Sequence, residues 1–91
     1  MAVYEITHGR ISSDGPSQVK LTGLLNGRKV LINNCNLIAS PPMMSRPSPC
    51  LIGNLVLNKD IFYYRMVYVI HVGDGKWKMI VNRNLDFLIL N

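Results

Sequence analysis

The chain has 91 residues, of which 48% are hydrophobic and 16% are charged, and ten Lys and Arg against five acids give a formal net charge of +5. This length suits one domain of ordinary size, and so large an apolar fraction with so little charge excludes a disordered acidic or basic tail. The excess of positive charge favours anionic partners.

The first ten residues contain no apolar run behind a basic start, which a secretory signal would have. No stretch approaches the ~18 apolar residues of a membrane span. We therefore expect a soluble, intracellular protein of the cytoplasm or nucleus. In such a reducing compartment, Cys35 and Cys50 are expected to be free thiols rather than a disulfide.

Turn-forming residues divide the chain into short segments rich in Val, Ile, Tyr and Phe, which is strand composition. Residues 12–16 form a breaker cluster, Asn26-Gly27 and Asp74-Gly75 are hairpin dipeptides, and residues 40–49 hold four prolines. The predicted strands are 2–11, 18–25, 28–38, 50–57, 61–72, 76–82 and 85–90. We expect one all-β domain over 1–91, a small antiparallel barrel or sandwich of five to seven strands, with an OB-like barrel as a fold-level analogy.

The Pro-rich segment 40–49 is interpreted as a long loop whose prolines prevent pairing with sheet edges. It could also be a polyproline-like ligand, or a loop phosphorylated at Ser45 or Ser48.

A weak repeat occurs at an offset of thirty residues. Its matching residues are Leu21, Gly23, Leu25 and Lys29 in the first copy and Leu51, Gly53, Leu55 and Lys59 in the second. Two equivalent hairpins could produce this pattern, but four identities are few, so we interpret it as chance combined with the shared demands of strand-turn-strand units.

Side chains alternate across a strand, so a two-residue turn predicts which residues of a hairpin share a face. With Asn26-Gly27 as the turn, Leu21 opposes Ile32 on a mostly apolar face. The opposite, outward face then contains Lys20 and Lys29.

The Asp74-Gly75 turn opposes Val72 with Trp77, and continues with Ile70 opposite Met79 and Tyr68 opposite Val81. This face is apolar throughout, so Trp77 is predicted to be buried. The outward side chains include Arg65, Lys76 and Lys78. Of the neighbouring aromatic residues, Tyr63 is predicted to point outward, whereas Phe62 and Tyr64 share the core face.

The last predicted strand, 85–90, is apolar on both faces, which implies burial on both sides. One chain of this length can hardly cover both, so a homodimer is expected. Its predicted interface residues are Leu85, Phe87, Leu88, Ile89 and Leu90.

No pattern in the chain predicts catalysis. Asp14 and Asp74 precede glycines in turns, where Asp is favoured for local hydrogen bonding. The two His and two Cys match no zinc-ligand spacing. We therefore expect no enzymatic activity, no cofactor and no metal site.

The sequence favours a small, non-enzymatic nucleic-acid-binding module that prefers single-stranded RNA or DNA. The predicted contacts are Lys20, Lys29, Arg65, Lys76 and Lys78 for phosphates and Tyr63 for base stacking. The alternative is a homodimeric protein- or lipid-interaction factor, such as a viral accessory or virion protein, which would explain the apolar C-terminal segment better.

Overall fold

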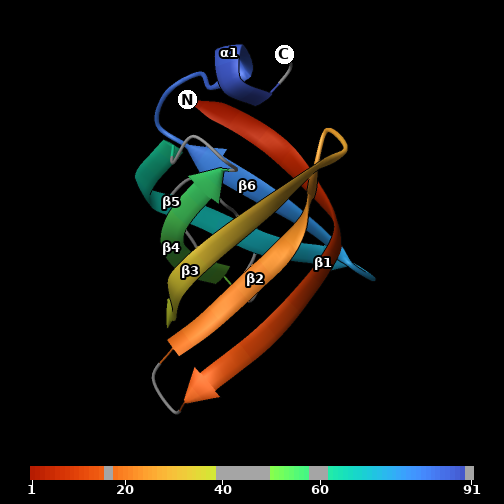
Figure 1. Cartoon of the computed structure of the whole chain (residues 1–91), viewed down its shortest axis with the longest axis vertical. Helices are drawn as coiled ribbons and strands as arrows, with labels where there is room; N and C mark the ends of the chain where they lie inside the picture. The colour runs from red at the N-terminus through yellow and green to blue at the C-terminus, as the bar shows by residue number, and fades with distance from the viewer. Residues whose placement is uncertain (16–17, 39–49, 58–61, 90–91) are drawn as a thin grey trace.

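The computed structural model describes residues 1–15, 18–38, 50–57 and 62–89, and these form a closed antiparallel barrel (Figure 1). Each strand pairs with the next along the chain, and the last strand pairs with the first. The elements are β1 (Ala2–Gly15), β2 (Gln18–Leu25), β3 (Arg28–Ile38), β4 (Cys50–Leu57), β5 (Phe62–Gly73), β6 (Lys76–Val81) and α1 (Asp86–Ile89). The predicted small antiparallel barrel is confirmed. The Pro-rich segment 40–49 lies outside the described residues.

The strands follow one another around the barrel in sequence order, as an up-and-down meander. The OB-fold is a five-stranded Greek-key barrel, so the OB-like analogy does not extend to the strand order. Each hairpin therefore lies beside its neighbours in the chain, and the outward residues of β2, β3, β4 and β5 form a continuous surface that curves halfway around the barrel.

The core consists of the inward side chains of all six strands. Trp77 is buried, as predicted. The buried side chains of the main core on the strands are Ile6, Leu21, Leu25, Val30, Ile32, Cys35, Leu51, Leu55, Leu57, Val67, Val69, Trp77, Met79 and Val81. The predicted register of the first hairpin is confirmed from Leu25 opposite Arg28 to Leu21 opposite Ile32. Lys20 and Lys29 therefore lie on the outward face of that hairpin.

One bulge in each of β1, β3 and β5 contains a residue with positive φ: His8 at 54°, Asn34 at 53° and Met66 at 60°. A bulge adds one residue to a strand and increases its local twist and bend. Closing a sheet of so few strands requires such curvature. The bulges are therefore part of how this chain closes its barrel.

Gly23 and Gly53 lie opposite the bulges of β1 and β3. A Cβ at Gly23 would lie 2.5 Å from Ile6 Cγ2, and a Cβ at Gly53 would lie 2.8 Å from the carbonyl oxygen of Asn33. Only glycine fits where the bulged strand approaches so closely. The match of Gly23 with Gly53 in the thirty-residue repeat thus has a physical cause rather than chance, because both glycines lie opposite a bulge.

The predicted register of the second hairpin is wrong for most of β5. Val72 is an extra residue next to the turn, so His71 rather than Val72 pairs with Trp77. Consequently Val69 points into the core and Val72 is 50% exposed. Arg65 nevertheless points outward as predicted, because the bulge at Met66 reverses the alternation a second time.

The predicted strand at 85–90 is also wrong, because the described part of this segment contains the single-turn helix α1. Leu85 and Ile89 lie four residues apart, on one side of this turn, and both are buried in the barrel's own core, whereas Phe87 is 52% exposed. Leu88 is half-buried, and Leu90 lies outside the described residues. The homodimer prediction thereby loses the observation on which it depended, and stays a prediction.

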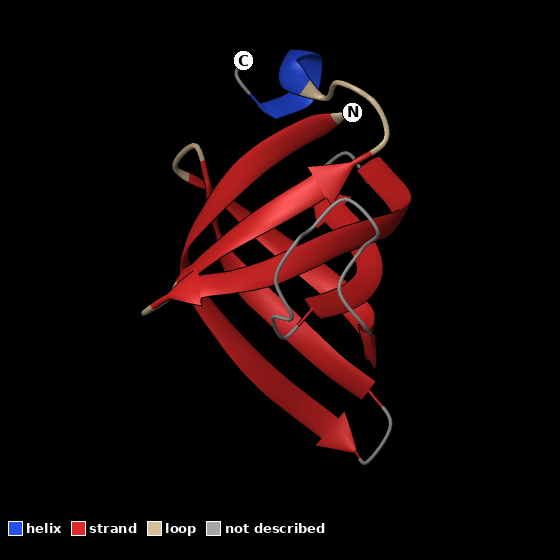
Figure 2. Cartoon of the chain, turned by 180° about the vertical axis from the view of Figure 1, so that it is seen from behind, coloured by secondary structure: helices blue, strands red, loops and turns tan. Residues whose placement is uncertain are grey.

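Side chains from distant parts of the chain hold α1 over one end of the barrel, beside the start of β1 (Figure 2). The Tyr4 hydroxyl accepts a hydrogen bond from the Leu85 N–H at 2.7 Å and donates one to Asp86 Oδ1 at 2.8 Å. Arg28 donates to the carbonyl oxygen of Leu88. Within the described ranges, no helix has the length and apolar character that a membrane crossing requires.

Candidate nucleic-acid interface

Outward side chains from β1 to β5 form a row that crosses the strands. Strand pairing places Arg10 opposite Thr22, Thr22 opposite Leu31, Leu31 opposite Val56, and Val56 opposite Tyr63. Each strand contributes one residue, because paired residues of neighbouring strands point to the same face. We call these five residues the outer row.

Three further cations flank the outer row, with Lys29 on one side and Lys20 and Arg65 on the other. Lys29 precedes Leu31 by two residues and therefore shares its face, and Lys20 has the same relation to Thr22. Arg65 follows Tyr63 by two residues, and its guanidinium carbon lies 5.9 Å from the centre of the Tyr63 ring, which is cation–π distance. We call the outer row together with Lys20, Lys29 and Arg65 the basic face.

The basic face contains no negative charge among the described outward residues of β2, β3, β4 and β5. Glu5 lies on β1, where it pairs with β6, and Asp86 belongs to α1. Where cations outnumber carboxylates on a surface, the local potential is positive and attracts polyanions.

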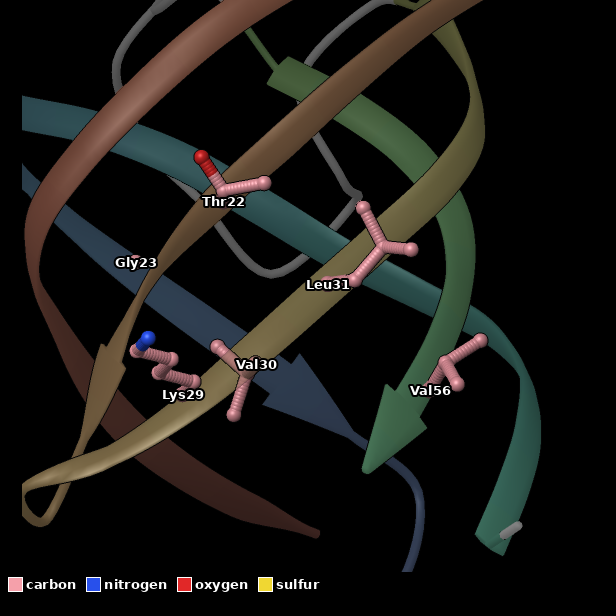
Figure 3. A pocket seen from close by; sticks show the side chains of 6 residues that line it. All are labelled: Thr22, Gly23, Lys29, Val30, Leu31 and Val56. Carbon is pink, nitrogen blue, oxygen red and sulfur yellow. The ribbon is translucent and has the colours of Figure 1, made fainter. Parts of the chain in front are cut away.

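A hollow of about 590 Å³ opens on the basic face (Figure 3). The residues that line it come from β2, β3 and β4, and they are Thr22, Gly23, Lys29, Val30, Leu31 and Val56. With apolar Leu31 and Val56, the Thr22 hydroxyl and the Lys29 ammonium, the hollow can hold a flat ring or a sugar beside a negatively charged group.

Tyr63 supplies the exposed ring of the basic face, as the sequence predicted. Its side chain is 44% exposed. The neighbouring rings of Phe62 and Tyr64 are half-buried and stack on each other, with centroids 6.2 Å apart and planes 12° from parallel, and both pack against the core. Tyr63 is thus available for stacking, whereas its two aromatic neighbours are used in packing.

The other two predicted phosphate contacts lie elsewhere on the barrel. Lys76 and Lys78 are exposed on β6, where Lys78 is paired with Glu5 on one side and with Ile70 on the other. The structure divides the five predicted cations into Lys20, Lys29 and Arg65 on the basic face and the pair on β6, which lies between β1 and β5; Lys78 pairs with Ile70, five residues beyond Arg65 on β5. Opposite charges next to each other weaken the local potential at Lys78.

Arg10 is the cation of the basic face that the sequence patterns did not identify, and Thr22, Leu31 and Val56 were not predicted as site residues either. Arg10 is exposed and paired with Thr22, but only because the bulge at His8 and Gly9 shifts the β1 register by one residue. A positive φ at a histidine has no reliable sequence signal. The pattern of β1 therefore did not reveal on which face Arg10 lies.

The two cysteines are free, as expected, and both are buried. Cys35 points into the core, where its Sγ donates to the carbonyl oxygen of Ile32 at 3.3 Å. Burial raises the pKa of the Cys35 thiol to about 11 and also raises the pKa of Cys50. Both thiols are therefore protonated at neutral pH and are poor nucleophiles or metal ligands. In the part of the chain that the structure describes, no three His, Cys, Asp or Glu residues gather closely enough to hold a metal ion.

The function of the basic face has to be inferred from the geometry of this chain alone. Comparison with models of known protein families, with curated proteins and with solved structures gave no match.

Proposed function

We propose that this protein is a small non-enzymatic module that binds single-stranded RNA or DNA through its basic face. One observation carries the proposal: the outward residues of β2, β3 and β5 include the cations Lys20, Lys29 and Arg65 and the exposed ring of Tyr63, and the described outward residues of β2 to β5 include no acid. Proteins that bind single strands combine these two features, since cations follow the phosphates and aromatic rings stack on the bases.

The preference for a single strand follows from the exposed ring and the hollow. In a duplex the base faces are stacked on one another, so Tyr63 could reach only phosphates and sugars. An unpaired base can stack on the Tyr63 ring or enter the hollow beside Leu31, while Lys29 contacts the adjoining phosphate. We therefore expect a duplex of equal length to bind more weakly.

The test is the affinity for a fluorescein-labelled hexathymidylate, measured by anisotropy between 50 and 200 mM salt. Three to four phosphate contacts on a single strand predict a slope of log K against log salt of about −2 to −3, which corresponds to a roughly 20- to 50-fold loss of affinity over this range. No binding at low salt, or an affinity that is indifferent to salt, would contradict the proposal.

A further inference from the structure

We infer that the bound nucleic acid lies across the β-strands, along the outer row from Arg10 to Tyr63, in a site about four to six nucleotides long. This inference rests on the proposed function and adds to it the path and length of the bound strand. It also assigns to Arg10 a binding role that sequence patterns did not suggest.

The path follows from where the cations are. On each of β2, β3 and β5, the described outward residues include a single cation: Lys20, Lys29 and Arg65 respectively. A nucleic acid aligned with β2 or β5 would meet only one of these cations, and one aligned with β3 would meet Lys29 and the exposed Arg28 beside it. A nucleic acid that crosses the strands and curves around the barrel passes all three, and also reaches Arg10 at the β1 end of the outer row.

The order of chemical groups along the outer row fits a strand with several phosphates and bases. Arg10 is at one end, and the hollow beside Thr22, Leu31 and Val56 is in the middle. Tyr63, with the Arg65 guanidinium near its ring, is at the other end. A short oligonucleotide gains most of its binding affinity from the hollow and the Tyr63 ring, whereas a longer one also contacts Arg10.

The length of the site follows from the spacing of the strands. The outer row crosses four of the six strand-to-strand steps of the closed barrel, at about 4.8 Å each, so it extends about 19 Å along the strand backbones and further at the ends of the outward side chains. Stacked nucleotides rise about 3.4 Å each, and a row of this length holds roughly six of them. Fewer are needed where the chain is extended, which gives about four to six.

The experiment is a length series of labelled oligothymidylates of two, four, six, eight and twelve nucleotides. We expect the affinity of the unaltered protein to rise steeply up to about six nucleotides and to change little beyond. Saturation at two nucleotides, or a steep rise that continues to twelve, would overturn the inferred path even though binding itself supports the proposed function. Failure of every length to bind would instead overturn both.

Substitutions at the two ends of the row test the direction of the path. Arg10→Gln is expected to weaken hexanucleotide binding several-fold and to make the salt slope shallower by about 0.7, while leaving dinucleotide binding unchanged. Tyr63→Leu is expected to weaken both by roughly 5- to 100-fold, because stacking on the ring is lost. Lys76→Gln on β6 is the matched control with the same change of charge. If Arg10→Gln and Lys76→Gln have equal effects on the hexanucleotide, the strand does not follow the outer row.

Discussion

Replacing Gly53 with Ala is expected to destabilise the barrel by about 3 kcal/mol, since the new methyl group would overpack a closed interior. Its Cβ would lie 2.8 Å from both the Asn33 carbonyl oxygen and Cys35 Sγ, and 2.9 Å from Ile32 Cγ2. The carbonyl oxygen belongs to the β3 backbone and can move only if the pairing of β3 with β4 changes. Thermal unfolding followed by circular dichroism should show a melting temperature lower by roughly 10 to 25 °C.

Gly73→Ala is the matched control for this substitution. Gly73 also lies in a strand, but a Cβ there would have no atom within 4 Å, and its φ is not positive. We expect a change below about 1 kcal/mol, with slight stabilisation possible because alanine restricts the unfolded chain. Equal stability of the Gly53→Ala and Gly73→Ala proteins would show that the close approach at the β3 bulge is not a constraint.

Reversing the charges at Lys29 and Arg65 together is expected to weaken binding of a hexathymidylate by roughly 100-fold or more. Lys29→Glu and Arg65→Glu remove two phosphate contacts and place carboxylates beside the nucleic acid, and like charges brought together cost several kcal/mol. Both side chains are exposed, so the core stays intact. Anisotropy at 50 mM salt measures the loss, and unfolding curves verify the fold.

The control reverses Lys76 and Lys78 on β6 instead. Each reversal changes the charge by two units, so both double variants go from +5 to +1 at neutral pH. Because salt screens charges that are farther than a Debye length from the nucleic acid, we expect the β6 variant to lose less than about 10-fold. An equal loss in both variants would mean that net charge, and not the basic face, governs binding.

The sequence predicted the hairpins and the outward position of most basic residues because two-residue turns restrict register strongly. Asn26-Gly27 aligned β2 with β3 correctly over the residues nearest the turn. The alignment changes further away, where Val19 pairs with Cys35 instead of Asn34, because Asn34 is bulged. Local turn chemistry thus determines register only as far as the first bulge.

The register of β5 could not be predicted because its irregularities occur at residues that carry no turn signal. Val72 and Met66 are ordinary strand residues by composition, yet one is an extra residue beside the turn and the other has a φ of 60°. Their position follows from barrel closure, which depends on all six strands together. Tyr63 and Arg65 were placed outward correctly only because the two irregularities compensate each other.

The C-terminal helix was missed because a short apolar run fits a strand and a helix equally well. Leu85 and Ile89 are four residues apart, a spacing that suits one side of a helical turn. Whether the segment forms a helix or a strand depends on Tyr4, about eighty residues earlier, whose hydroxyl accepts a hydrogen bond from the Leu85 N–H and donates one to Asp86. Such a contact becomes visible only when β1 and the end of β6 are known to be neighbours.

The most direct test of the basic face is a titration of the ¹⁵N-labelled protein with hexathymidylate at low salt, followed by backbone amide chemical shifts. We expect the largest shifts on the outward residues of β2, β3, β4 and β5, with Thr22, Lys29, Leu31, Val56 and Tyr63 among them. Shifts concentrated on β6 or α1, or no shifts at all, would contradict this expectation.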